Sequence, residues 1–166
     1  KEALRYIETM IEEGAGIIDL GGVSSRPGSL SVSDEEELAR VKPIIDLIDE
    51  HKLYHKAKFS LDSYSPMCVE YALSHGFSIV NDIKALANDD VARMVAKYDA
   101  TVVLMHMQGE PSMMQHEPSY EDVIVEVDAF FEERIEKAKR FGIKKIVLDV
   151  GIGFGKSLEH NLTLLK

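Results

Sequence analysis

The chain has a single cysteine, Cys68, few basic residues and no long apolar run. One cysteine excludes an internal disulfide and a zinc site built from several cysteines. A membrane-spanning helix needs about 18–20 consecutive apolar residues, and the amphipathic, charged N-terminus is unlike a signal peptide. The 19 lysines and arginines face 29 acidic residues, and nucleic-acid binding requires a basic surface. We therefore expect a soluble cytoplasmic protein that binds neither nucleic acid nor membrane.

The length of 166 residues and the 45% hydrophobic content fit one domain over residues 1–166. Short apolar, β-branched runs are continuous rather than alternating, which is typical of parallel strands buried on both faces. Segments with helical periodicity separate these runs, so we expect an α/β protein with a parallel sheet. The predicted strands are Gly16–Leu20, Lys58–Asp62, Phe77–Asn81, Thr101–Met105 and Lys145–Asp149.

Helix ends carry recognisable signals. Ser33 and Glu36 have the spacing of a capping box, and Ser65 followed by Pro66 reads as an N-cap with proline at the first helical position. Glycines stand where helices are expected to end, just ahead of the next strand. These C-cap candidates are Gly14, Gly76 and Gly142.

The spacing of the predicted units distinguishes between α/β folds. Five strands in 166 residues give about 33 residues per unit, and a (β/α)8 TIM barrel of about 250 residues needs about 31. The chain opens in a predicted helix, Lys1–Glu13, and ends in another that begins near Leu158. We expect the central part of such a barrel, with about five of its eight units. A five-stranded flavodoxin-like sheet is the alternative.

Polar residues end four of the five predicted strands, where α/β folds carry their chemistry. A single Asp there could simply cap the next helix, but several on one rim predict a binding site. Carboxylates and an amide can hydrogen-bond a flat, nitrogen-rich heterocycle, or can hold a divalent metal through oxygen. His106 reads as a ligand, an acid or a packed rim residue. The strand ends are Asp19, Asp62, Asn81, Met105-His106 and Asp149.

Two loops add to this site. In the loop 21–28, glycines allow close backbone approach, Ser25 offers a hydroxyl, and Arg26 offers a planar fork for phosphate oxygens. The glycine-rich loop 151–156 lacks Walker spacing. We interpret it as a flexible wall beside a flat ligand, with Phe154 available for stacking.

These stretches together resemble dihydropteroate synthase, in the family's order and over nearly the whole chain. The resemblance implies a TIM barrel that joins p-aminobenzoate to a hydroxymethyl-dihydropterin diphosphate and releases pyrophosphate, with Mg²⁺ as cofactor. It implies a transferase of folate biosynthesis, of the class that sulfonamides target. The stretches that carry the resemblance are 19–28, 59–63, 81–83, 103–109 and 148–156.

The resemblance also assigns roles to residues. Asp62 and Asp149 would favour positive charge on the pterin during catalysis, and Arg26 would stabilise the leaving anion. Binding of the substrates is expected from a larger set. That set is Asp62, Asn81 and Asp149 on the pterin ring, Met105, Phe154 and Gly155 along its pocket, Ser25 and Arg26 at the diphosphate and p-aminobenzoate, and Asp19 beneath their loop.

The chain departs from the family at three positions: Val23 stands for the usual Glu, Ser25 for Thr and Val150 for Pro. The family's magnesium-binding Asn and the Lys, Arg and His of its last strands find no counterpart here, so no metal ligand is assigned. We expect a fragment without synthase activity of its own. A homodimer is compatible with the sequence, which leaves the oligomeric state open. The alternatives are a pterin-binding methyltransferase domain and a non-catalytic α/β interaction module.

Overall fold

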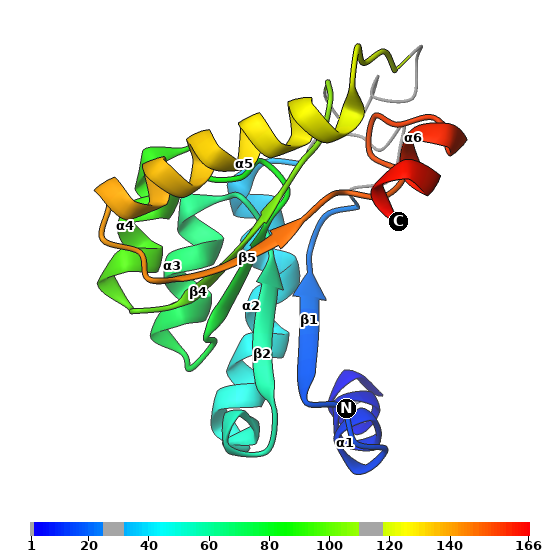
Figure 1. Cartoon of the computed structure of the whole chain (residues 1–166). Coiled ribbons are helices and arrows are strands. Elements are labelled where there is room, and N and C mark those ends of the chain that lie inside the picture. Colours follow the sequence, from blue (N-terminus) through cyan, green and yellow to red (C-terminus); the bar gives the residue numbers. More distant parts are fainter. Residues whose placement is uncertain (1, 25–31, 110–117) are drawn as a thin grey trace.

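The structure, a computed structural model, describes residues 2–24, 32–109 and 118–166, in which strands and helices alternate (Figure 1). The strands are β1 (Ile17–Gly21), β2 (Lys58–Asp62), β3 (Ile79–Asp82), β4 (Thr101–Met105) and β5 (Lys145–Asp149). The helices are α1 (Glu2–Glu12), α2 (Asp34–Glu50), α3 (Pro66–Ser74), α4 (Asp89–Lys97), α5 (Val123–Arg140), α6 (Leu158–Leu164) and the short 3-10 helix η1 (Leu53–His55).

All neighbouring strands of the sheet pair in parallel and in chain order, β1-β2-β3-β4-β5. The strands turn steadily across the sheet, from β1 and β2 to β5, which crosses the view in Figure 1. A flavodoxin-like sheet changes its winding direction and would have the order 2-1-3-4-5. The observed order is that of consecutive units of a barrel, so the predicted α/β barrel architecture is confirmed and the flavodoxin-like alternative is wrong.

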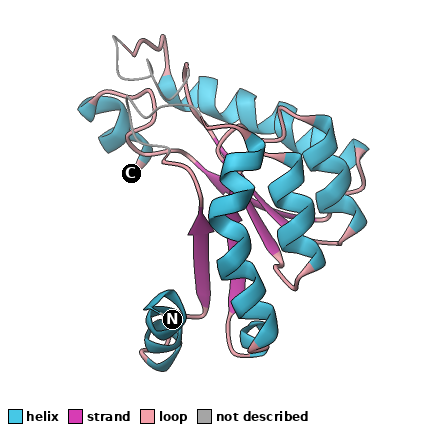
Figure 2. Ribbon diagram, turned by 180° about the vertical axis from the view of Figure 1, so that it is seen from behind, coloured by secondary structure: helices cyan, strands magenta, loops and turns pink. Residues whose placement is uncertain are grey.

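One face of the sheet carries the hydrophobic core. Helices α2 to α5 pack on this outer face, which Figure 2 shows from the helix side. Because side chains alternate along a strand, every second residue points toward these helices. The outward-pointing residues of the three central strands are almost fully buried: Phe59, Leu61, Val80, Val102 and Leu104 each have 0% exposure.

The opposite, inner face is less covered at the two edge strands. Ile17 on β1 is 58% exposed and Val147 on β5 is 49% exposed. Both belong to strands that pair on one side only in the described sheet. Burial on both faces, expected from the continuous apolar runs, therefore holds for the central strands but is wrong for β1 and β5.

The helix ends largely follow the predicted signals. Ser65 accepts the backbone N–H of Cys68, with proline opening α3. The three C-cap glycines have φ between 81° and 99°. Ser33 does cap α2 by accepting the Glu36 N–H at 3.2 Å, but the Glu36 carboxylate binds Arg40 one turn further on instead of returning to the cap. Only half of the predicted capping box forms.

The same substitution should lower the free energy of unfolding by different amounts on the two faces of the sheet. Val80→Ala removes two methyl groups from the packed outer face and should lower the free energy of unfolding by about 2 kcal/mol. Val147→Ala makes the same chemical change on the exposed inner face, so it should cost less than about half as much. Urea unfolding of the two variants measures this. Equal losses would contradict the assignment of the core to one face.

Candidate functional site

The carboxyl ends of the strands bring the predicted site residues onto the inner face. Register pairs Asp62 with Asn81 across β2 and β3, and Met105 with Asp149 across β4 and β5. Asp19 on β1 pairs with Ser60, one inward position before Asp62. Because side chains alternate, all five of these residues point to the side opposite the helices. The predicted shared rim is therefore present among the described residues.

Asp19 is bound to Asn81 across the intervening strand. The Asn81 Nδ2 donates to the Asp19 Oδ2 at 3.2 Å. An ionised carboxylate only accepts hydrogen bonds, so the amide nitrogen must face Asp19. The Asn81 Oδ1 is thereby turned away from Asp19, where it can accept a hydrogen bond from a ligand.

Asp62 lies on this face with a strongly raised pKa. Burial raises the pKa of its carboxyl group to about 6, and the nearby charges of Asp19, Glu37 and Asp82 add to the effect. Glu37, on α2, is 5% exposed, and burial raises its pKa as well, although a hydrogen bond with Ser63 opposes this rise. The carboxylates are close enough to disfavour one another's charge, and a ligand that donates hydrogen bonds would relieve that repulsion.

Asp82 follows Asn81 but points to the other side of the sheet. Its carboxylate accepts the backbone N–H groups of Lys84 and Leu86 at 2.8 and 2.7 Å, and burial raises its pKa. The residue is 1% exposed. Asp82 therefore shapes the turn after β3, while Asn81 faces the site.

The glycine-rich loop after β5 is held tightly against the end of β4. Asp149 Oδ1 accepts the Gly151 N–H at 2.8 Å, and the His106 N–H donates to the Asp149 carbonyl at 2.9 Å. A Cβ on Gly151 would lie 2.1 Å from the His106 carbonyl oxygen, and one on Gly155 would lie 2.3 Å from that of Gln108. Only glycine allows the two loops to approach this closely.

Lys156 ends this loop, and the sequence analysis did not foresee its role. Its side chain is buried at 3% exposure, and its ammonium contacts His106 Nδ1 at 2.9 Å and three backbone carbonyls. His106 is itself buried, so it is a packed rim residue. Hydrogen bonds cross-link the loop 151–156, and its interpretation as a flexible wall beside a flat ligand stays a prediction. The only feature of the sequence that could have indicated this role of Lys156 is its position beside three glycines.

The remaining predicted residues have mixed outcomes. Met105 is 3% exposed, and Phe154 is partly buried within the loop. Ser25 and Arg26 lie outside the described residues, so their predicted contacts with anionic groups stay predictions. The roles expected for Met105, Phe154 and Gly155 in binding also stay predictions.

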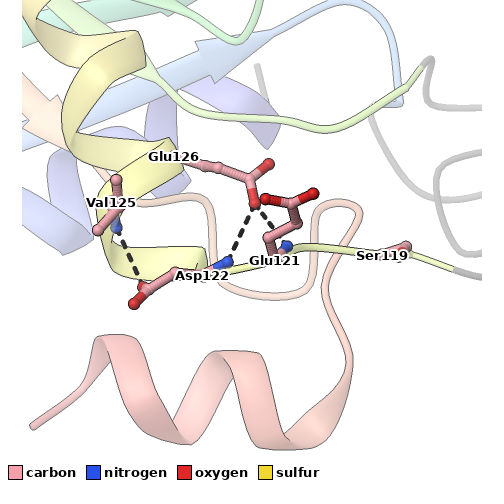
Figure 3. Close-up of a pocket in the computed structure, with 5 residues that line it drawn as sticks. All are labelled: Ser119, Glu121, Asp122, Val125 and Glu126. Atoms are coloured by element: carbon pink, nitrogen blue, oxygen red, sulfur yellow. Dashed lines mark hydrogen bonds between the residues drawn. The ribbon is translucent and has the colours of Figure 1, made fainter.

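A separate hollow of about 410 Å³ lies at the start of α5 and contains none of the predicted site residues (Figure 3). Two of its carboxylates, those of Asp122 and Glu126, accept backbone N–H groups at the start of the helix. Glu126 accepts the backbone N–H groups of Glu121 and Asp122, and Asp122 accepts those of Ile124 and Val125. The hollow is lined by Ser119, Glu121, Asp122, Val125 and Glu126.

Within residues 2–24, 32–109 and 118–166, no group of three or more His, Cys, Asp or Glu side chains is arranged to hold a metal ion. We derive no step through magnesium. No helix in the same part of the chain is long and apolar enough to cross a membrane.

Comparison with known proteins gives consistent matches. The pterin binding enzyme family matches residues 1–166. The dihydropteroate synthase of Escherichia coli K12 is 41% identical over 166 residues, which cover 99% of this chain and 58% of that protein. The Yersinia pestis dihydropteroate synthase, solved with a sulfonamide drug, superposes with a TM-score of 0.91 at 38% identity, over 98% of this chain and 58% of that one.

A third match concerns the Clostridium difficile dihydropteroate synthase, solved in the presence of pteroic acid. It superposes with a TM-score of 0.86 at 38% identity and covers 98% of this chain and 59% of that one. The chain thus spans just under three fifths of the length of these three relatives.

The raised pKa of Asp62 predicts a pH dependence of stability. Between about pH 4 and pH 6, folded Asp62 keeps a proton that the unfolded chain has released. The folded state binds more protons in this window, so Asp62 makes stability fall as the pH rises. Asp62→Asn should show a smaller fall over this window in urea unfolding. A carbon-13 NMR titration should place the Asp62 midpoint near 6, and Asp19→Asn should lower it. A midpoint near 4 in the unmutated chain would contradict the assignment.

Proposed function

Because this chain belongs to the pterin-binding enzyme family, with dihydropteroate synthases as relatives at about 40% identity, we propose that its inner sheet face binds a reduced pterin. The observation that carries the proposal is the placement of Asp62, Asn81 and Asp149 on one face at the carboxyl ends of their strands. The proposed ligand lies across these three groups, with its ring edge toward the strands.

The chemistry of a pterin complements these groups. A 2-amino-4-oxopterin edge carries an amino group and ring N–H donors beside a carbonyl acceptor. Asp62 and Asp149 can accept from the donors, and the Asn81 oxygen, turned away from Asp19, can accept a further N–H. Charge-assisted hydrogen bonds of this kind are stronger than neutral ones.

We propose dihydropteroate synthesis as the reaction that this site serves. The bond between the pterin methylene carbon and the diphosphate oxygen breaks, and the amine nitrogen of p-aminobenzoate bonds to that carbon and loses a proton. Positive charge develops on the ring and methylene in the transition state. Carboxylates fixed beside the ring stabilise that charge, so Asp62 and Asp149 would be the catalytic groups on this side.

Other residues are proposed to bind the anionic groups of the substrates. Ser25 and Arg26 remain the proposed contacts of the diphosphate and the p-aminobenzoate. Lys156 is not available as a second cation there, because its ammonium is buried against His106 and three carbonyls. Asp19 and Asp149 are exposed on the open inner face, so water competes for their hydrogen bonds. We therefore propose that the 166-residue chain binds pterin more weakly than its longer relatives and does not turn over substrates efficiently.

Binding of 6-hydroxymethylpterin by isothermal titration calorimetry at pH 7.5 tests the proposed site. Asp62→Asn keeps the shape of the side chain but removes its charge, so we expect a loss of about 1.5–3 kcal/mol of binding free energy. Asp128→Asn makes the same change on the exposed surface of α5 and should leave the affinity unchanged. If the Asp62→Asn variant folds normally by circular dichroism and binds the pterin as tightly as the unmutated chain does, Asp62 is excluded from the site.

A further inference from the structure

Lys156 places a buried ammonium at the junction of two loops. Its Nζ lies 2.9 Å from His106 Nδ1, 3.2 Å from the His106 carbonyl, 3.1 Å from the Gly151 carbonyl and 3.0 Å from the Phe154 carbonyl. His106 follows β4, whereas the other two carbonyls belong to the loop after β5. The ammonium therefore joins the ends of two neighbouring strands.

The contact with His106 fixes the state of its ring. Burial lowers the pKa of Lys156 to about 8, so below that pH its side chain is an ammonium that only donates hydrogen bonds. His106 Nδ1 then accepts with its lone pair, and the ring proton sits on Nε2. Burial and the charge of Lys156 lower the pKa of His106 to about 4, which agrees with a neutral ring. The ring is also packed edge-on against Phe130, with centroids 4.9 Å apart.

The same ammonium sets the path of the glycine-rich loop. The Gly151 carbonyl accepts both from Lys156 and from the Phe154 N–H, at 3.1 and 3.0 Å. The Phe154 carbonyl turns toward the ammonium as well. Both backbone polar groups of Phe154 are therefore tied, directly or through Gly151, to one buried charge.

Contacts with the segment after β4 hold the far side of the loop. Tyr120 donates its hydroxyl to the Gly155 carbonyl at 2.8 Å. Gln108 fixes the segment that carries Tyr120, because its side-chain amide donates to the Ser119 carbonyl and accepts the Ser119 N–H. Without the ammonium, the four acceptors around it would lose the three N–H donors that they share, which favours rearrangement of the loop.

We propose that Lys156 is a positioning residue that holds Phe154 in place beside the pterin-binding face. This inference rests on the proposed function for its ligand, but its structural basis is the cage of four acceptors around one ammonium. Direct contact of Lys156 with a substrate anion is a poorer interpretation, because the side chain is 3% exposed and its donors are already engaged.

A double-mutant cycle in pterin affinity tests this role, with 6-hydroxymethylpterin as the probe and calorimetry as the measurement. Lys156→Met should weaken binding by about tenfold in the unmutated background but by less than about twofold when Phe154→Ala is already present. Lys144→Met, an exposed lysine ahead of β5, is the matched control and should change nothing. Equal losses in both backgrounds would mean that Lys156 does not act through Phe154 and would overturn the proposal.

Two measurements judge the cage separately from pterin binding. Nitrogen-15 NMR of the unmutated chain should show His106 with its proton on Nε2, and a proton on Nδ1 would overturn the proposal even if Lys156→Met fails to fold. If the unmutated chain binds no pterin, the proposed function fails. Amide exchange then decides on the cage: faster exchange of the Phe154 amide in Lys156→Met than in Lys144→Met supports the positioning role, and equal exchange overturns it.

Discussion

Parallel pairing of neighbouring strands in chain order is the constraint on which the rest of this structure depends. It gives every strand the same direction, so all carboxyl ends meet at one edge. The pleat then sends alternate residues to opposite faces, as the neighbours Asn81 and Asp82 illustrate. Asn81 joins Asp19 on the inner face, whereas Asp82 shapes a buried turn on the outer side. A shift of one residue in register would exchange these two roles.

The electrostatics of the site follow from this geometry. Several carboxyl groups gather at the strand ends, and burial together with mutual repulsion raises the pKa of Asp62 to about 6. The buried cation nearby, Lys156, is engaged with backbone carbonyls and His106 rather than with a free carboxylate. The rim thus retains acceptors for a ligand that brings its own donors, such as the pterin that we propose.

Much of the fold was predictable from local sequence, and the exceptions have physical causes. The run Lys145–Asp149 matches β5 at both ends, because its three central apolar residues, Ile146 to Leu148, lie between a helix-ending glycine, Gly142, and a loop-forming glycine, Gly151. Its burial was not predictable, since that depends on which strands lie beside it. The capping box at Ser33 formed only in part, because Arg40 lies one turn from Glu36 and competes for its carboxylate.

The shared face of the polar residues at the strand ends was predictable for the same reason as the strands, because position in a parallel strand fixes the face. The role of Lys156 was not. The sequence shows one lysine beside three glycines, and only the backbone of those glycines, each with φ between 63° and 83°, determines where the loop carbonyls point. Because glycine adopts positive and negative φ angles about equally readily, these angles cannot be predicted from residue type alone.

The central claim is that the inner face at the carboxyl ends of the strands binds a pterin, and an NMR titration of the chain with 6-hydroxymethylpterin tests it most directly. The account predicts that the Asn81 side-chain amide and the backbone amides of Met105 and Gly151 shift progressively as the ligand is added. Amides on the outer face of α2 and α3 should stay in place. Shifts confined to the helices, or to the hollow at the start of α5, would contradict the account.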